Sequence, residues 1–475
     1  MNIRKRALRI LQVSTSDLAG GAERSATNLH EAFRKLGAES WLAVGMKRGI
    51  DPDVFMIRNE CNRNSWVRGL SRLRADNDSW VRRVRGLGRL IALLQGIGEP
   101  IRWMNGQLGI EDFAFPGTKG LLDLVPHRPD IVHCHNLHGN YFDLRELPRL
   151  SSSVPTILNL RDAWLLSGHC AFSFDCQRWK HGCGKCPDLG IFPSVRRDAT
   201  AYNWQRKKNI LRESRVYVTT PSQWLMDRVR DSIVAPAIID SRVIPNGVDT
   251  SVFSPGDKVA TRAELGIPSA ARVLLFAANG IRSNIWKDYK TLSNAMRIVG
   301  AQHGSESFLL LALGETAPPE YIGNAMIKFV PFQSDLTSLA KFYRAADLYV
   351  HAAHVESFGN TVIEARACGT PVVATAVGGI PEHVRSLACD YSAHGVQEHS
   401  LAVATGILTA PGNAEALAHS ILYLFAMPEV LNKLAANALK DIHERFSLSL
   451  QAEHFLAWYG EILANEIRFP PNRGS

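Results

Sequence analysis

The sequence lacks several features that would define its class at once. Its 475 residues contain no run of 18 apolar residues, so we expect no membrane-spanning helix. Arg9 interrupts the apolar stretch 7–13, which makes the basic N-terminus a poor signal peptide and favours a buried first strand. No G-x-G-x-x-G fingerprint of dinucleotide-binding domains is present. What remains, with 46% hydrophobic and 21% charged residues, is typical of a soluble globular enzyme and excludes a disordered or fibrous protein.

Cysteine is also scarce, with eight residues, and without a secretion signal we expect the thiols to be reduced. Four of them cluster in an irregular, Cys-rich loop, 165–195, as Cys170, Cys176, Cys183 and Cys186. Four thiolates match the ligand count of a structural zinc site, and the last two have the usual C-x-x-C spacing. His169 and His181 are alternative ligands. The other interpretation is four packed, reduced thiols, because the first spacing is not standard.

Positive charge is concentrated in one segment. The formal net charge is +9, and the stretch from Arg58 to Arg102 holds ten arginines and four acidic residues. Apolar residues there recur at steps of three and four, which predicts a helical stripe within a basic insertion, 58–115. Trp66 and Trp80 fall on that stripe rather than among the arginines, which favours burial or a lipid interface over base stacking. We therefore expect contact with an anionic inner-leaflet surface, or a helical lid with solvated arginines, and no nucleic acid.

The rest of the chain alternates between short apolar runs and amphipathic helical segments, which predicts α/β architecture. The expected strands are 9–14, 41–44, 131–135, 155–160, 216–219 and 242–244, then 272–277, 307–313, 327–330, 348–351 and 371–375. This pattern predicts two parallel-sheet domains, 1–255 and 256–447, followed by a C-terminal helix, 448–475, that packs back on the first domain. Ligands of such sheets bind beyond the carboxyl ends of the strands, so the expected site is the cleft between the domains.

The strongest chemical motif joins a strand to a helix. Its sequence, Glu-Ser-Phe-Gly-Asn-Thr-Val-Ile-Glu, runs from Glu356 to Glu364. The main-chain N–H groups of Asn360, Thr361 and Val362 would be unpaired at the helix start and would suit a phosphate. Glu364, one turn into the helix, could accept both hydroxyls of a ribose. A similar helix start, Gly20-Gly21, follows the first strand, but a lone Gly-Gly also fits a plain tight turn.

This Glu-x7-Glu signature resembles the retaining glycosyltransferases of family 4, which have the GT-B fold of two Rossmann-like domains facing across a cleft. The turn 244–249 and the blocks 371–375 and 377–382 are similar to further motifs of that family. The Cys-rich loop, with His135-Asn-Leu-His138 and Asp162-Ala-Trp before it, resembles a subgroup that makes bacterial surface polysaccharides. The resemblance implies a cytoplasmic enzyme, peripheral at the inner membrane, that acts on a nucleotide sugar and on a glycan or lipid-linked acceptor.

The resemblance also implies roles for individual residues. Glu356 would lie near the transferred sugar, with His138 and His135 as further candidates for contact with it. The expected donor-binding residues are Gly21, Arg282, Lys287, Phe358, Gly359, Asn360, Thr361 and Glu364. Arg282 and Lys287 would hold the pyrophosphate, so catalysis would need no cofactor or metal. One departure from the family is Arg161, which stands where many relatives have a histidine that faces the donor sugar.

Two other functions fit parts of the sequence. A nucleotide-sugar 2-epimerase uses the same fold but needs an acid/base set for proton abstraction, and the retaining-transferase signature argues against it. A nucleic-acid-binding protein could use the arginine-rich segment, although the position of the tryptophans disfavours base stacking. The glycosyltransferase is therefore the leading hypothesis.

Overall fold

The computed structural model of the protein describes residues 6–18, 20–60, 66, 94, 97–302 and 307–468. Most of the predicted basic insertion, 58–115, lies outside these residues, as does most of its apolar stripe. Trp66 of that stripe is described, and it is 56% exposed and not buried. Internal contacts divide the chain into two compact units. The first unit comprises Met1–Thr220, Met226–Arg242 and Leu456–Ser475, and the second comprises Pro221–Leu225 and Val243–Phe455. The chain therefore changes unit at residues 242 and 243, about a dozen residues before the predicted boundary at 255.

In the described part of the first unit, seven strands form one sheet in the order β3-β2-β1-β4-β5-β6-β7. The pairs from β3 through to β6 are all parallel. The strands are β1 (Arg9–Ser16), β2 (Glu39–Met46), β3 (Val54–Met56), β4 (Ile131–His135), β5 (Thr156–Asn159), β6 (Val216–Thr220) and β7 (Ile238–Val243). The helices between these strands include α1 (Gly21–Lys35), α5 (Pro100–Gln107), α6 (Leu147–Ser153), α7 (Thr200–Arg212) and α8 (Gln223–Arg230).

Short 3-10 helices occupy several of the remaining connections: η2 (Pro116–Asp123), η3 (Leu144–Glu146), η4 (Trp164–Leu166), η5 (Arg178–Lys180) and η6 (Ala235–Ala237). The central strands β4, β5 and β6 are buried along their whole length. Burial on both faces is typical of the strands of a parallel sheet, and here it includes polar residues such as His133, His135 and Thr219.

The last helix, α16 (Leu448–Arg468), passes from the second unit into the first at Leu456. Beyond that point, the Trp458 indole N–H donates to Asp240 at 2.9 Å, and the Tyr459 hydroxyl bonds to His133 of β4. Trp458 and Tyr459 are both completely buried. The second half of the C-terminal helix is therefore part of the first unit's core.

The described residues of the second unit form a nine-stranded sheet in the order β10-β11-β9-β8-β12-β13-β16-β14-β15. Of its strand pairs, β10–β11 is antiparallel and the others are parallel. The strands are β8 (Arg272–Ala277), β9 (Phe308–Leu313), β10 (Glu320–Ile322), β11 (Ala325–Val330), β12 (Leu348–His351), β13 (Val372–Thr375), β14 (Ser386–Leu387), β15 (Glu398–His399) and β16 (Gly406–Thr409). The sequence did not predict β10 or the last three strands.

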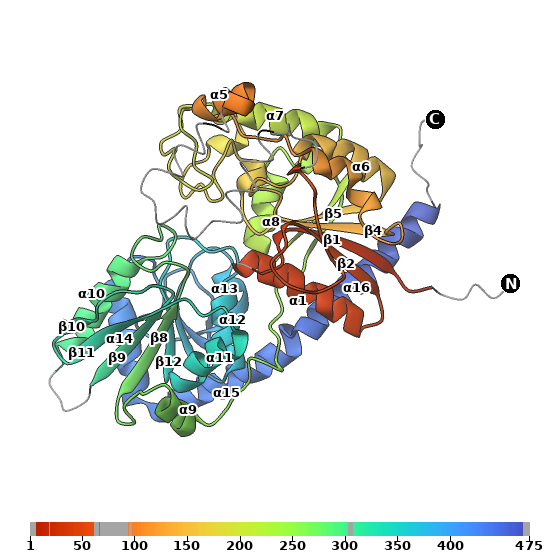
Figure 1. Ribbon diagram of the computed structural model, residues 1–475. Coiled ribbons are helices and arrows are strands. Elements are labelled where there is room, and N and C mark those ends of the chain that lie inside the picture. The colour runs from red at the N-terminus through yellow and green to blue at the C-terminus, as the bar shows by residue number, and fades with distance from the viewer. Residues whose placement is uncertain are drawn as a thin grey trace. The chain divides into compact units, whose positions relative to one another are not determined.

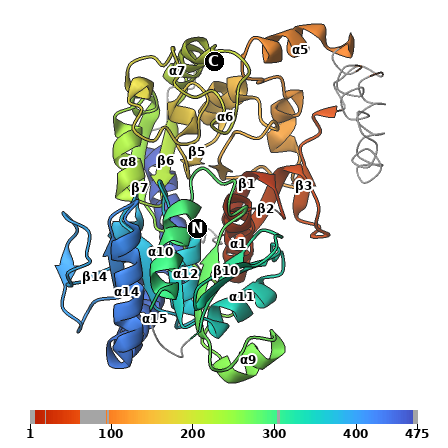
Figure 2. The same cartoon turned by 90° about the vertical axis from the view of Figure 1, so that its left-hand side faces the viewer.

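Helices cover both faces of this second sheet. They are α9 (Lys258–Glu264), α10 (Tyr289–Gly300), α11 (Leu336–Ala345), α12 (Asn360–Ala367), α13 (Ile380–His383), α14 (Ala414–Ala426) and α15 (Pro428–Arg445). Alternate residues of β8 point to opposite faces: Val273 and Leu275 join the core under α11 and α12, whereas Leu274 and Phe276 join the core under α10 and α14. Figure 1 shows α10 and α14 on the opposite side of these strands from α11 and α12, and Figure 2 shows α10 and α14 from outside.

In the described residues, no single helix is long and apolar enough to cross a membrane. α14 and α15 together would pass that test by length and composition, but the chain bends by 102° between them. Leu417, Ile421 and Leu424 of α14 are fully buried in the core of the second unit.

Candidate functional site

The site on the second unit lies at the carboxyl ends of its central strands. Loops 278–288, 352–359 and 376–379 follow β8, β12 and β13, and a main-chain bridge between Lys287 and Ala353 joins the first two. The third loop packs against the second so closely that a Cβ on Gly378 would lie 1.7 Å from the Glu356 carbonyl oxygen. These contacts hold the predicted Glu-x7-Glu motif at the edge where ligands of parallel sheets bind.

The start of α12 depends on a glycine. Gly359 has a φ of +88°, and a Cβ there would lie 2.5 Å from the side chain of Ile380. The Asn360 side chain accepts a hydrogen bond from Asn246 at 2.8 Å, which ties the predicted turn 244–249 to the helix start. Thr361 lies in the first turn of α12. The Val362 N–H, predicted to be unpaired, instead donates to the Gly359 carbonyl oxygen at 3.0 Å. The helix N-terminus is thus fixed by its neighbours before any ligand binds.

Phe358 was predicted to bind the donor, but its side chain lies in the core. It is 2% exposed, and its ring packs against His383 and Phe446 in the core. His383 bonds through Nε2 to the Phe358 carbonyl oxygen at 2.5 Å. A direct contact between the Phe358 ring and a donor is therefore a prediction that the burial does not support. The residue anchors the loop that carries Glu356.

Glu356 forms an ion pair with Lys287. The Lys287 Nζ lies 2.6 Å from Glu356 Oε2, and His351 Nε2 lies 3.2 Å from the same ammonium and 3.7 Å from the same oxygen. Burial alone would raise the pKa of Glu356, but the charge of Lys287 and the hydrogen bonds from Lys287 and His351 bring it well below its ordinary value. Burial, with Lys287 nearby, lowers the pKa of His351 to about 4. The site thus contains an ionised carboxylate, an ammonium group and a neutral imidazole.

Arg282, the other predicted pyrophosphate contact, is held separately. Its guanidinium pairs with Glu315 at 2.6 Å, and its main-chain N–H donates to the same carboxylate at 2.9 Å. Glu315 follows β9 directly after Gly314, so it also lies at the carboxyl edge of the sheet. The Arg282 side chain is 45% exposed and therefore accessible to an anion.

Glu364 is one turn into α12, as predicted, and is 9% exposed. Its Oε2 accepts a hydrogen bond from the Tyr343 hydroxyl at 2.7 Å. Burial, reinforced by this carboxylate, raises the pKa of Tyr343 well above its ordinary value, so the tyrosine remains a donor. The hydrogen bond fixes the orientation of the carboxylate within the helix.

The first unit gathers a second set of polar groups at the carboxyl ends of β1, β4 and β5. Gly21 begins α1 immediately after β1, with Gly20 as its N-cap. Gly139, after β4, contacts the side chain of Thr15, so the two loops are in direct contact. After β5, Asp162 accepts hydrogen bonds from His138 at 2.7 Å and Asn136 at 2.7 Å.

His138 and His135 differ sharply in accessibility. His138 is 15% exposed in its side chain, and its ring has edge contacts with Trp164 and Phe192. His135 is 1% exposed, bonds to Gln12 and stacks on His133 at 4.4 Å between ring centres. The prediction that His135 touches substrate therefore fails on burial: β4 directs this side chain into the protein interior, whereas His138 lies on the loop beyond.

Arg161, which stands where many relatives of the resembled family have a histidine, is 7% exposed. Burial lowers its pKa to about 10, and its charge helps to lower the pKa of both His133 and His135. Its main-chain N–H donates to the Asn136 side chain at 3.1 Å. The residue is thus enclosed beside the buried histidines.

His138 borders a cavity of about 270 Å³ within the first unit. Its wall combines aromatic rings with polar groups from three loops, including Phe113, Trp164, Phe192, Glu111 and Asp112. Aromatic faces and hydrogen-bonding side chains are the two kinds of surface that a sugar ring requires. The cavity is the sugar-sized recess nearest to His138.

The cysteines of loop 165–195 are all free thiols. Cys186 lies 3.3 Å from the Nε2 of His169, and Cys183 accepts a hydrogen bond from the Gly168 N–H. Across the described residues, no three His, Cys, Asp or Glu side chains form a group able to hold a metal. The geometry therefore does not fit the predicted zinc site as the side chains stand.

Two protein families match consecutive parts of the chain. Residues 19–252 match Glycosyltransferase Family 4, and residues 261–441 match Glycosyl transferases group 1. D-inositol 3-phosphate glycosyltransferase of Mycobacterium tuberculosis is 43% identical over 155 residues, a match that covers 32% of this chain and 32% of that protein. The match thus spans about a third of the length of the curated relatives.

Solved structures of other proteins are similar to the protein over nearly the whole chain. Sucrose-phosphate synthase from Thermosynechococcus elongatus has a TM-score of 0.59 at 19% identity, covering 96% of this chain and 100% of that one. Anabaena HepE, solved with UDP and glucose, has a TM-score of 0.57 at 16% identity, covering 95% and 99%. The two parallel sheets have the GT-B fold. The chain is thus similar to a glycosyltransferase family 4 domain over residues 19–252 and to a glycosyltransferase group 1 domain over residues 261–441.

Residues of the two sites that were not predicted include His351, Glu315, Tyr343 and Asp162. His351 ends the strand that leads into the predicted loop of Glu356, and Glu315 lies just beyond the end of β9; both positions could have been noted from the sequence. Asp162 was recognised only as part of a motif. Its pairing with His138 joins residues 24 apart and follows from β4 and β5 being neighbours in the sheet.

Proposed function

We propose that the protein transfers a hexosyl group from a nucleotide sugar to a glycan or lipid-linked acceptor, with retention of the anomeric configuration. The observation that carries this proposal is the Lys287–Glu356 ion pair at the start of α12, within the Glu-x7-Glu motif. A cation and a carboxylate held 2.6 Å apart at the carboxyl edge of a parallel sheet suit a ligand with both a pyrophosphate and a sugar.

On the donor side, Lys287 and Arg282 would bind the pyrophosphate and stabilise its charge as the glycosidic bond breaks. Main-chain N–H groups of Asn360 and Thr361 would add to this at the start of α12. Glu364 would accept the ribose hydroxyls, oriented by the hydrogen bond from Tyr343. This set of groups supplies the charge stabilisation that a metal ion supplies elsewhere.

Glu356 would orient the transferred sugar through its hydroxyls rather than attack it. The low pKa of Glu356 keeps its carboxylate ionised. When the donor binds, Lys287 would pair with the donor phosphate in place of Glu356. In a front-face reaction the acceptor oxygen attacks C1 from the side of the leaving phosphate. The C1–O bond to the phosphate breaks, and the departing phosphate takes the proton of the acceptor hydroxyl.

On the acceptor side, the cavity beside His138 would hold the sugar that receives the hexosyl group. The Cys-rich loop contributes Phe192 to its wall, and the resemblance of that loop to surface-polysaccharide enzymes supports an acceptor from capsule, exopolysaccharide or lipopolysaccharide synthesis. α5 has no buried residue, and Ile101, Trp103 and Met104 on it are about half exposed or more. These side chains support a peripheral position at the inner membrane.

The test is incubation with a panel of UDP-, GDP- and ADP-sugars, with donor hydrolysis measured first. A hydrolysed donor is then offered with acceptor mixtures, and the anomeric configuration of the product is read by NMR. Turnover of one donor with a retained configuration supports the proposal. Inversion, or the absence of turnover across the panel, contradicts it.

A further inference from the structure

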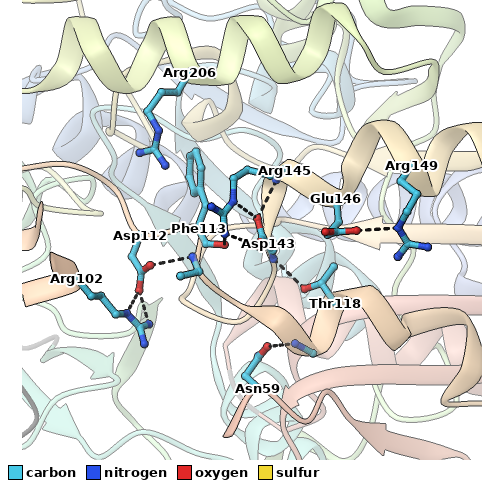
Figure 3. Close-up of polar contacts among 12 residues, drawn as sticks. Asn59, Arg102, Asp112, Phe113, Thr118, Asp143, Arg145, Glu146, Arg149 and Arg206 are labelled. Carbon is cyan, nitrogen blue, oxygen red and sulfur yellow. Dashed lines mark hydrogen bonds and ion pairs between the residues drawn. The ribbon is translucent and has the colours of Figure 1, made fainter. Parts of the chain in front are cut away.

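A second cavity in the first unit, of about 500 Å³, is bordered by three arginines. Arg102 comes from α5, Arg145 from η3 and Arg206 from α7, so three separate elements direct guanidinium groups to one place. Figure 3 shows Arg206 reaching from its helix towards the ring of Phe113, with Arg102 and Arg145 in the same neighbourhood. No residue of this cavity was among the predicted site residues.

Two of the three arginines are neutralised within the protein. Arg102 pairs with Asp112 and, at 3.1 Å, with Glu99. Arg145 pairs with Asp143 at 2.7 Å and also donates to the Phe113 carbonyl oxygen. These pairs hold the two side chains in fixed directions but leave little of their charge uncompensated.

Arg206 differs from both. Its guanidinium carbon lies 4.1 Å from the centre of the Phe113 ring, and it donates to the main-chain oxygen of Glu111 at 2.8 Å. Among the described residues, no carboxylate lies within ion-pair distance of it. The Glu111 carboxylate is already paired with the buried ammonium of Lys207 at 2.9 Å. Arg206 is therefore a half-buried cation, stacked on a ring and without a direct ion pair among the described residues. Burial lowers its pKa and outweighs the opposing effect of the nearby Glu111 and Asp112 carboxylates, so its charge is offset only in part.

A half-buried charge without a direct ion pair is unfavourable because part of its hydration is lost and distant carboxylates compensate for only part of that loss. An anion bound in the cavity would relieve that cost. It would also meet further N–H groups, because the guanidinium has five donors and the two contacts above use few of them. The arrangement favours an anionic ligand.

The position of the cavity connects it to the acceptor site. Its wall shares Glu111, Asp112 and Phe113 with the smaller cavity that His138 borders. One ligand could therefore place a sugar ring among the aromatic residues of the smaller cavity and an attached anionic group beside Arg206.

We propose that this arginine-lined cavity binds a phosphate group of the acceptor, attached to the sugar that occupies the cavity beside His138. The inference rests on the proposed function, because it names the chemical class of its acceptor. A phosphate fits better than a carboxylate for a geometric reason. Its tetrahedral oxygens can meet donors that arrive from three elements in different directions, whereas a carboxylate offers two oxygens in one plane.

The phosphate could belong to a soluble sugar phosphate or to a lipid-linked one. Calorimetric titrations without donor would use inorganic phosphate, glucose 1-phosphate and glucuronate. Parallel flotation assays would use phosphatidylcholine vesicles with and without a prenyl phosphate. Binding of the soluble phosphates identifies a soluble source, and binding only to prenyl-phosphate vesicles identifies a lipid source. Either result supports the proposal if it depends on Arg206.

The deciding comparison is between Arg206→Gln and Arg149→Gln. Arg149 is also on the first unit, and Figure 3 shows it paired with Glu146. Neither residue lines the cavity, so substitution of Arg149 should change affinity by less than about twofold. Loss of a charged hydrogen-bonding group should weaken phosphate binding by about tenfold to a hundredfold in Arg206→Gln. Lys287→Gln should keep this binding, which separates the cavity from the donor site.

Arg206→Lys is the second variant, because it keeps the charge and most of the packing on Phe113 if the glutamine variant is unstable. It should bind phosphate more weakly than the wild type but more tightly than the glutamine variant. Equal binding by the wild type and both Arg206 variants would overturn the proposal, as would glucuronate binding as tightly as glucose 1-phosphate. These titrations need no donor turnover, so their failure is distinct from a failure of the donor panel.

Discussion

The ammonium group of Lys287 lies 2.6 Å from a carboxylate oxygen of Glu356, and His351 contacts both. The three side chains come from two loops and the end of a buried strand, so the sheet itself brings them together. Any anion that binds Lys287 competes with Glu356 for the ammonium group. Donor binding should therefore free the Glu356 carboxylate to contact the sugar just where charge develops during transfer.

We expect Glu356→Gln to lower kcat by about a hundredfold, because it removes a preorganised charge from the reacting centre. Steady-state kinetics with the donor found in the panel would measure this. Glu398→Gln is the matched control, since Glu398 is an exposed glutamate on the short strand β15, and it should leave kcat unchanged. Near-normal kcat in the Glu356 variant would contradict the role given to this motif.

Glu364 should affect donor binding instead. Its contact with the ribose would exist in both the ground state and the transition state, so Glu364→Gln should raise the donor KM more than it lowers kcat. Tyr343→Phe keeps the ring but removes the 2.7 Å hydrogen bond that orients Glu364, and it should raise the donor KM by a smaller factor. A fall in kcat at unchanged KM in both variants would be inconsistent with this assignment.

Gly378 is expected to tolerate no side chain. With a φ of +55° and a Cβ position 1.7 Å from the Glu356 carbonyl oxygen, Gly378→Ala must displace the loop that carries Glu356. We expect a loss of about 1–3 kcal/mol in the free energy of unfolding, together with reduced kcat. Chemical denaturation and kinetics would measure the two effects.

The control for Gly378 is Gly460→Ala. Gly460 lies inside α16, and a Cβ there would have no atom within 4 Å. Alanine should stabilise that helix by about 0.5–1 kcal/mol, because it lowers the conformational entropy of the unfolded chain. If the two alanine variants behaved alike, the close approach at Gly378 would not be the cause of any loss.

The sequence predicted the central strands well because they are buried on both faces and read as largely apolar runs. β4, β8 and β12 have the predicted bounds. The last three strands of the second sheet were missed because β14 and β15 have only two residues each and β16 begins at a glycine. Strands this short are defined by pairing with neighbours, which the local sequence does not encode.

In the candidate sites, too, the sequence predicts local relationships but not contacts between distant segments. Glu356 and Glu364 are joined to each other by one helix, so their spacing in sequence is enough to place them. The pairing of Lys287 with Glu356 spans 69 residues and that of His138 with Asp162 spans 24, and both depend on strand order. The burial of His135 and Phe358 could not be inferred either, because a strand end and a loop look alike in sequence whether the side chain faces inward or outward.

His138 gives a prediction about pH. Burial alone would lower its pKa, but the opposite charge of Asp162 and the hydrogen bond to it outweigh burial and raise the pKa above the ordinary value of 6.5. A histidine that binds its proton more tightly in the folded state stabilises the fold below its unfolded pKa. It loses that contribution as pH rises through the folded pKa.

His138 should therefore contribute most to the free energy of unfolding at acidic pH. His138→Gln should lower the free energy of unfolding more at pH 6 than at pH 9, because the wild type holds a protonated His138 beside the Asp162 carboxylate to a greater extent at the lower pH. Urea denaturation at the two pH values would measure the difference. His394→Gln is the control: His394 is exposed, and its substitution should have the same small effect at both. A loss in the His138 variant that is independent of pH would show that the ring contributes through its packing against Trp164 and Phe192, and not through an ion pair with Asp162.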